Sequence, residues 1–520
     1  MHEVELTLGL LVAVAMLSTL ARAIGVPSPI LLVVGGVLLA LSPAVPDVVL
    51  APDLVFLLIL PPLLYIAAFD TAIRDVRAML RPILSLTVGL VLATTIAVAV
   101  VVHAVLPEIG WPAAFALGAI VSPPDAVAAV AVLRRLSVPQ RLVTLLEGES
   151  LFNDATALIA FRFAVAAMAT ASFSLADAAV QFVFVGTGGI LVGIVVGAAI
   201  ALLRRRLTDP PVEIITSLLT PFASYLVAEQ LHVSGILSVV TTGLALGWWS
   251  PRIMEAEVRV RARAVWDMVI FALNGLVFLL IGLQLSMILP SLAGRSPLVT
   301  IGMGVLVSLV VIVVRLLWVA PAALGLPILG HRKRWSDVLI MGWAGMRGVV
   351  SLATALALPL ETPNRDLLLW LTFCVILATL VGQGLTLPWL VRALGVSDDG
   401  SSSEQELRAR AAALDAACTR IQRLGEEWPD HLPLIETLKS QYQHRATHLG
   451  ELRSTETDGN GLPLSQAAEQ ELLEHGQIKR AVIDAERAAI LDLRQRGEIG
   501  DQAWRRVERD LDLEELRLEA

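Results

Sequence analysis

Residues 115–133 read FALGAIVSPPDAVAAVAVL, an apolar run that is interrupted near its middle by Pro123, Pro124 and Asp125. A second run, residues 338–358, reads VLIMGWAGMRGVVSLATALAL and has three glycines around Arg347. Proline removes a backbone donor and clashes with the preceding turn, and glycine lowers helix stability. Both runs therefore predict helices that are broken halfway along their length.

The composition is that of a polytopic, all-α membrane protein. The 520 residues have a mean hydropathy of +0.74, and only 17% are charged, against about 25% in soluble proteins. Apolar runs of about 20 residues recur, which is enough to cross a hydrocarbon core of about 30 Å. Glu3 and Glu5 are unlike a signal peptide, so we expect the first run to be retained. The thirteen predicted spans are about 4–21, 28–42, 53–70, 83–106, 111–133, 142–168, 177–203, 212–230, 233–249, 265–289, 297–320, 336–358 and 366–392.

The charges divide the chain into two regions. Residues 396–520 hold 26 acidic and 16 basic residues, whereas residues 1–395 hold 21 and 23. We expect a membrane domain over residues 1–395 and an acidic, helical tail over residues 396–520. Within the tail, residues 406–424 and 467–497 predict amphipathic helices, and residues 454–463 predict a loop.

The loops between spans predict how the chain is oriented. One alternate set of loops holds 17 Arg and Lys residues, and the other set holds only Arg295 and Arg365. The positive-inside rule places the basic set and the tail in the cytoplasm and the N-terminus outside. We expect the membrane to be the cell inner (plasma) membrane.

The two broken spans lie seven spans apart and therefore run in opposite directions. Interrupted helices at matching positions of two halves indicate a transporter site between inverted repeats. We expect the repeats to cover residues of about 4–168 and 212–392.

Residues 145–161, LLEGESLFNDATALIAF, put acidic side chains inside the sixth span. By helical rise, Asp154 and Asp125 fall within about 8 Å of each other in depth, near the middle of the bilayer. Ser150 and Asp154 share one helix face, and Glu149 and Asn153 share the neighbouring one. An acid at this depth costs about 2.5–3.5 kcal/mol, so a function is expected.

These groups predict a small site rich in oxygen. Carboxylates at Asp154 and Asp125, the Ser150 hydroxyl and backbone carbonyls freed at Pro124 suit a dehydrated alkali cation, with Na⁺ as the transported metal. Burial and a neighbouring acid favour the protonated form of a carboxyl group. A proton and a cation would then compete for Asp154, which is sufficient for antiport. Each of these residues could instead have a purely structural role. Asp154 could form an ion pair, Asp125 could cap a helix, and Ser150 could bond to the carbonyl of residue 146.

Other charges in the spans have structural interpretations. Glu149 requires a cationic partner, with Arg315 considered first and Arg347 second, and Asn153 replaces what could be a second titrating acid. Arg162 is expected to extend toward the outer surface. Asp70 is expected at the cytoplasmic interface.

Three functions are compatible with this pattern. Exchange of Na⁺ for H⁺, for pH and sodium homeostasis, is preferred, and K⁺/H⁺ exchange is the alternative within transport. A cation channel or a sensor that signals through the tail belongs to a different class, but no filter or signalling motif is present. No nucleophile–base set or cofactor loop is found, so we expect no enzyme activity, no cofactor and no nucleic acid partner.

Four strings resemble monovalent cation:proton antiporters of the bacterial sodium/hydrogen exchanger type. They are GESLFNDATA at 148–157, SPPDAVAAVAVL at 122–133, LPPLLY at 60–65 and GMRGVVSLA at 345–353, and the tail string AERAAILDLRQRGEI resembles bacterial members. The resemblance implies a homodimer with a dimerisation domain and a six-helix core that moves like an elevator. It also implies Asp154 as the binding aspartate, completed by Asp125, Ser150 and the backbone. Asn153 implies the electroneutral Asn-Asp branch.

One position departs from the family pattern. Some members carry a third acid in the third span, where Ile66 stands in this chain. The resemblance therefore implies a smaller ligand set here.

Overall fold

A computed structural model of the chain contains only helices among the residues it describes, which agrees with the all-α expectation. The described residues are 2–42, 55–71, 73–74, 79–134, 136, 138–170, 175–291, 296–322, 335–396, 401–457, 481–493, 496, 507, 511 and 514–515. Arg295 and the basic loop Arg332 to Arg334, which were used to predict orientation, lie outside them.

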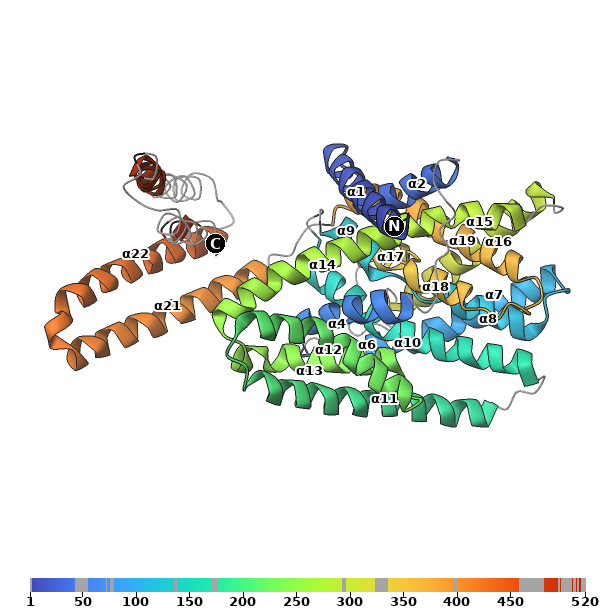
Figure 1. The fold of residues 1–520 in the computed structure, drawn as a ribbon, viewed down its shortest axis with the longest axis horizontal. Helices are drawn as coiled ribbons and strands as arrows, with labels where there is room; N and C mark the ends of the chain where they lie inside the picture. Colours follow the sequence, from blue (N-terminus) through green and yellow to red (C-terminus); the bar gives the residue numbers. More distant parts are fainter. Residues whose placement is uncertain are drawn as a thin grey trace. The chain divides into compact units, whose positions relative to one another are not determined.

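The chain forms two compact units, Met1–Asp398 and Asp399–Ala520 (Figure 1). The helices of the first unit are α1 His2–Ala23, α2 Ser28–Ala40, α4 Leu60–Asp70, α6 Leu80–Leu84, α7 Val91–Val105, α8 Trp111–Val121, α9 Ala126–Leu133, α10 Gln140–Thr170, α11 Leu175–Arg204, α12 Pro210–Gln230, α13 Gly235–Ile253, α14 Ala256–Leu283, α15 Leu285–Ser291, α16 Pro297–Val319, α17 Trp335–Trp343, α18 Val349–Leu356, α19 Arg365–Leu377 and α20 Gly384–Ala393. π-helical turns at Val55–Ile59, Ser85–Leu90 and Ala378–Gln383 lead into α4, α7 and α20.

Each predicted span overlaps one or more of these helices. Among the described residues, nine helices are long and apolar enough to cross a membrane, and Ser28–Ala40 and Val55–Asp70 are shorter apolar helices. This establishes a polytopic membrane protein, while the number of thirteen crossings stays a prediction.

The second unit contains two packed helices, α21 Ser401–Glu427 and α22 Leu432–Thr457, joined by the short turn Pro429–His431. Residues 406–424 are helical as expected. The predicted loop 454–463 is wrong at its start because α22 continues to Thr457, and the rest of that loop lies outside the described residues. Helix is also present at 481–493, inside the predicted 467–497.

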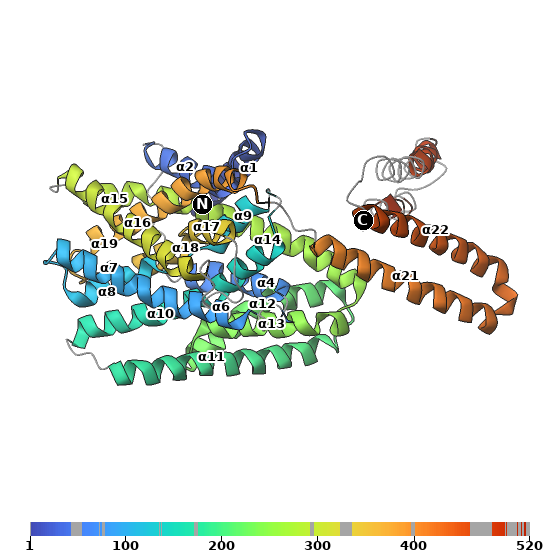
Figure 2. The ribbon, with the colours of Figure 1, turned by 180° about the vertical axis from the view of Figure 1, so that it is seen from behind.

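The helices of the first unit pack in two groups. The crossing bundle comprises α6 to α10 and α16 to α20, and the scaffold comprises α1, α2, α4 and α11 to α14. Figure 2 shows α11, α12 and α13 side by side along one edge, with α7, α8 and α16 at one end. Small residues allow close contact inside the scaffold, since Gly247 of α13 lies against the backbone of Phe69 in α4.

Helix α10 lies at the boundary of the two groups. Leu142 and Leu146 belong to the larger apolar core, which joins the crossing bundle to parts of α1, α2 and α14. Leu151 and Ala155 pack instead into the apolar core of the scaffold. Asp154 is therefore carried on the helix that faces both groups.

Candidate functional site

The two predicted helix breaks are present, and they meet. Helix α8 ends at Val121 and α9 begins at Ala126, while α17 ends at Trp343 and α18 begins at Val349. The amide of Asp125 in the first break donates to the carbonyl of Met346 in the second, at 2.7 Å. Backbone groups freed by one break are thus satisfied by the other, which explains how broken helices persist inside the bundle.

Asp125 caps the second half of the first broken helix. Its Oδ1 accepts from the amide of Val127 at 2.9 Å, and the amide of Val349 at the start of α18 also interacts with the carboxylate. Its Oδ2 lies where a side chain on Gly348 would be, so residue 348 has to be glycine. The carboxylate therefore lies between the N-terminal ends of α9 and α18, which favour negative charge. The capping alternative for Asp125 is thus realised.

Arg347 lies in the second break and contacts the C-terminal end of α8 in the first. Its guanidinium donates to the carbonyl of Ser122 just after α8, and its amide donates to the Thr379 hydroxyl at 2.9 Å. Its Nε and Nη2 have no hydrogen-bond partner among the described residues. A cation is favourable at a helix C-terminus, so the structural role expected for Arg347 fits, but its pairing with Glu149 does not.

Glu149 pairs with Arg315, the partner considered first. The two side chains form a bidentate pair with N–O distances of 2.5 and 2.9 Å, and each side chain is at most 2% exposed. Nε of Arg315 also donates to the carbonyl of Met341 at 3.1 Å. This ion pair joins α10, α16 and α17, and it neutralises one of the two acids in residues 145–161 that lie near the breaks.

Asn153 and Ser150 attach α10 to the first break. Asn153 donates from Nδ2 to the carbonyl of Pro124 at 3.0 Å, and its Oδ1 is buried with no partner among the described residues. The Ser150 hydroxyl accepts from the amide of Ala126 at 3.4 Å. Sequence reasoning gave Asn153 only a structural role and missed its free oxygen, which points to a further ligand.

Asp154 differs from every other charge near the breaks. It is 4% exposed, and within the described part of the chain it makes no hydrogen bond and no ion pair. The alternative of an ion pair with an arginine is therefore not realised there. Asp125 is close enough to repel it electrostatically. The site thus offers one uncompensated carboxylate beside a second carboxylate, an amide oxygen, a hydroxyl and a backbone carbonyl.

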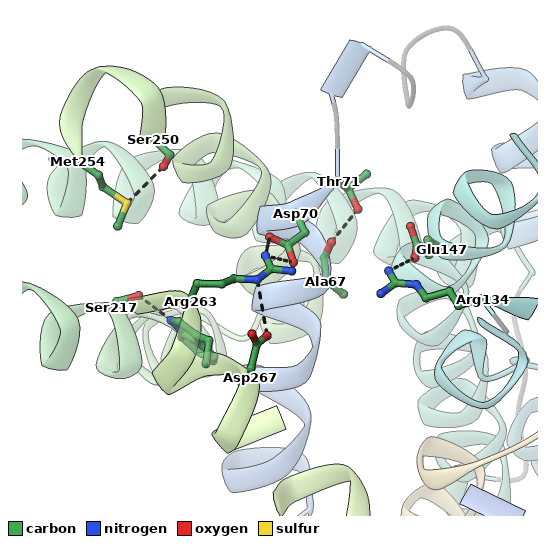
Figure 3. A network of polar contacts seen from close by, with 11 residues as sticks. Ala67, Asp70, Thr71, Arg134, Glu147, Ser217, Ser250, Met254, Arg263 and Asp267 are labelled. Carbon is green, nitrogen blue, oxygen red and sulfur yellow. Dashed lines mark hydrogen bonds and ion pairs between the residues drawn. The ribbon is translucent and has the colours of Figure 1, made fainter. Parts of the chain in front are cut away.

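A network of charged side chains lies around Asp70, at the end of α4 in the scaffold (Figure 3). Both carboxylate oxygens of Asp70, the last residue of α4, accept from Nη1 of Arg263 at 2.7 and 2.8 Å, and Asp267 lies 3.5 Å from Nε of that arginine. Arg134 and Glu147 of the crossing bundle form another pair at 3.1 Å. Asp70 is the last residue of α4, and its place at the cytoplasmic interface stays a prediction.

Ile66 lies one turn before Asp70 on the same helix. It is buried and lines a cavity of about 560 Å³ together with Tyr65, Asp70 and Trp266. An apolar side chain therefore stands at this point, and it cannot act as a third acidic ligand.

Arg162 is 54% exposed and therefore extends toward a surface, and the prediction that this is the outer surface is not tested. Its Nη2 lies 3.1 Å from Oε1 of Glu229, near the end of α12. The ion pair was not predicted because the acid lies on a distant part of the chain, which hydropathy does not place beside α10.

Comparison with known proteins identifies the family. The profile described as sodium/hydrogen exchanger, transmembrane, matches residues 9–393. A protein of Mycobacterium tuberculosis (strain ATCC 25618 / H37Rv), described as an uncharacterized Na⁺/H⁺ exchanger, is 36% identical over 548 residues, covering 99% of this chain and 97% of its own length. A sodium, potassium, lithium and rubidium/H⁺ antiporter of Bacillus subtilis (strain 168) is 36% identical over 386 residues, covering 70% of this chain and 58% of its own.

The fold agrees with that assignment. The sodium proton antiporter MjNhaP1 from Methanocaldococcus jannaschii, solved at pH 8, superposes with a TM-score of 0.63 at 19% identity, covering 75% of this chain and 99% of its own. The chain belongs to the sodium/hydrogen exchanger family, and it is a membrane-embedded cation/proton antiporter, not an enzyme.

Proposed function

We propose that the protein exchanges Na⁺ for H⁺ by competition of the two ions for Asp154. The observation that carries this proposal is the isolation of the Asp154 carboxylate, which is buried and unpaired among the described residues. An ionised carboxylate in that setting is costly and has to be neutralised. A bound proton and a bound cation both neutralise it, and each excludes the other.

The surrounding oxygens supply the rest of a cation site. We assign as ligands the Asp154 carboxylate, the Ser150 hydroxyl, Oδ1 of Asn153 and the Pro124 carbonyl, with Asp125 as a nearby charge or ligand. Support comes from the contacts of Ser150 and Asn153 with the first break and from the unpartnered Oδ1. Na⁺ prefers such hard oxygen ligands.

The exchange is electroneutral in this proposal. Asn153 is neutral, Glu149 is paired with Arg315, and Asp125 caps two helix N-termini. Only Asp154 is left to release a proton, so one proton leaves for each monovalent cation that binds. This also assigns the chain to the Asn-Asp branch.

K⁺/H⁺ exchange is the second candidate. The Bacillus subtilis relative is described as accepting sodium, potassium, lithium and rubidium. Ile66 supplies no third carboxylate in this chain, and fewer charged ligands discriminate less strongly between alkali cations.

Alternating access would use the two halves of the membrane unit as inverted repeats. Asn153 of the sixth span bonds to the break in the fifth, and Thr379 of the thirteenth bonds to the break in the twelfth. This parallel supports repeats over about 4–168 and 212–392. We place the protein as a homodimer in the plasma membrane, with the N-terminus outside, the acidic tail in the cytoplasm, and a role in pH and sodium homeostasis.

Proteoliposomes that contain a pH-sensitive dye test the proposal. Cation gradients of Na⁺, Li⁺ and K⁺ should drive proton movement in the wild type and none in Asp154→Asn. Valinomycin, used where K⁺ is not the test ion, should leave the rate unchanged if exchange is electroneutral. Robust exchange by Asp154→Asn would refute the site, and cation flux without proton movement would identify a channel.

A further inference from the structure

The ion pair of Arg162 and Glu229 connects the two helix groups. Arg162 belongs to α10 of the crossing bundle, and Glu229 belongs to α12 of the scaffold, 67 residues later. The side chains are 54% and 33% exposed, so water reaches both. The pair therefore lies at a wet boundary and is not part of a packed core.

Glu229 also lies beside the start of another scaffold helix, α13. The carboxylate lies next to Gly235, the first residue of α13, with Oε1 3.3 Å from the position of a Cβ there. The N-terminus of α13 favours a negative charge, whereas the C-terminal end of α12, where Glu229 itself stands, disfavours one. The Glu229 side chain is bonded to Arg162, and the start of α13 favours its negative charge.

Both side chains line a cavity of about 420 Å³, and Asp154 itself is not among the residues that line it. Its walls include Ala155, the residue after Asp154, and Leu158, one turn further along α10. Asp154, Leu158 and Arg162 follow at intervals of four residues and share one helix face. Arg162 lies about 12 Å along the helix from Asp154.

We propose that Glu229 is a positioning residue for cation exchange, which neutralises the Arg162 guanidinium about 12 Å along α10 from Asp154. This inference rests on the proposed function of Asp154. The pair, and not either residue alone, keeps the cavity close to neutral. A free guanidinium there would repel every cation that approaches, and a free carboxylate would attract it.

The size of the effect follows from Coulomb's law. One unit charge at about 12 Å and an effective dielectric constant of about 20 changes the affinity for a monovalent cation about tenfold. Because both side chains are partly exposed, screening reduces this to about threefold to tenfold, and less at high ionic strength.

The test is a charge cycle in right-side-out membrane vesicles, where cations approach the face predicted to be external. Glu229→Gln should raise KM for Na⁺ about threefold to tenfold, and Arg162→Gln should lower it by a similar factor. The double variant should return KM close to the wild-type value. Raising the ionic strength with an impermeant salt should shrink both single effects. Glu257→Gln, which removes a charge from the exposed Arg261 pair of α14, is the matched control and should leave KM unchanged.

The outcomes separate this inference from the proposed function. If wild-type vesicles exchange no cation for protons, the proposed function fails. If the wild type is active and both single variants shift KM in the same direction, or neither shifts it, the pair has only a structural role and the inference is overturned. Melting temperatures of all variants in detergent identify any loss of folding, and opposite KM shifts at equal stability support the inference.

Discussion

The buried ion pair of Glu149 and Arg315 predicts a large and asymmetric effect on stability. Each side chain is at most 2% exposed, and the pair is bidentate. Glu149→Ala leaves the Arg315 guanidinium buried without its counter-ion, which costs about 3–5 kcal/mol of unfolding free energy. Replacing both residues, as Glu149→Met with Arg315→Leu, removes both charges and should recover part of that loss.

The double variant should not regain the full stability of the wild type, because Arg315 also has a contact outside the ion pair. Nε of Arg315 donates to the carbonyl of Met341, just before the second break. The double variant leaves that carbonyl unsatisfied, at a cost of about 1–3 kcal/mol. The double variant should therefore be more stable than Glu149→Ala by about 2 kcal/mol, although it stays less stable than the wild type.

Unfolding in detergent micelles, followed by the fluorescence of the 11 tryptophans, measures these differences. Glu257→Ala breaks the exposed pair with Arg261 and is the control, with an expected loss below about 0.5 kcal/mol. A loss below about 1 kcal/mol for Glu149→Ala would refute the reasoning. So would a double variant that is no more stable than Glu149→Ala.

Three further predictions concern the site. Gly348→Ala should lower the exchange rate at least tenfold, because the new methyl group meets the Asp125 carboxylate. Gly302→Ala is the control, since the space around Gly302 is open, and it should be neutral or stabilise the protein by up to about 1 kcal/mol. Transport rates and melting temperatures of the two variants test this. Asn153→Asp should make exchange electrogenic by adding a second acid, and a rate that stays independent of valinomycin would contradict this. Asp125→Asn should lower cation affinity while leaving a capped α9, since asparagine also caps helices; a KM unchanged in liposomes would count against Asp125 as a nearby charge.

Much of this site could be predicted because few residue types are tolerated inside a membrane. Pro123 and Pro124 cannot continue a helix, so the first break follows from the sequence. Buried charges are so rare that Glu149 had few possible partners, and Arg315 was one of two. Depth also follows from the sequence, because helical rise is constant.

What could not be predicted is the direction in which each helix faces. Hydropathy does not say that Gly348 leaves space for Asp125, or that the Thr379 hydroxyl accepts from the amide of Arg347. Glu229 stands at a helix end and reads as an ordinary interfacial acid, so its contact with Arg162 depends on packing between distant helices. Contacts of this kind depend on rotation about helix axes, which a hydrophobic pattern without a clear polar face leaves open.

The fixed charges explain why exchange can depend on a single carboxylate. Arg315 neutralises Glu149, and two helix N-termini stabilise the negative charge of Asp125. A group that is already neutralised gains little from binding a further ion, so it stays in one charge state while ions arrive and leave. Asp154 has no such partner in the described chain and gains from either ion. The proton and the cation therefore compete at Asp154 because the neighbouring charges are already stabilised. Breaking one of those neighbouring contacts should alter transport as well as stability.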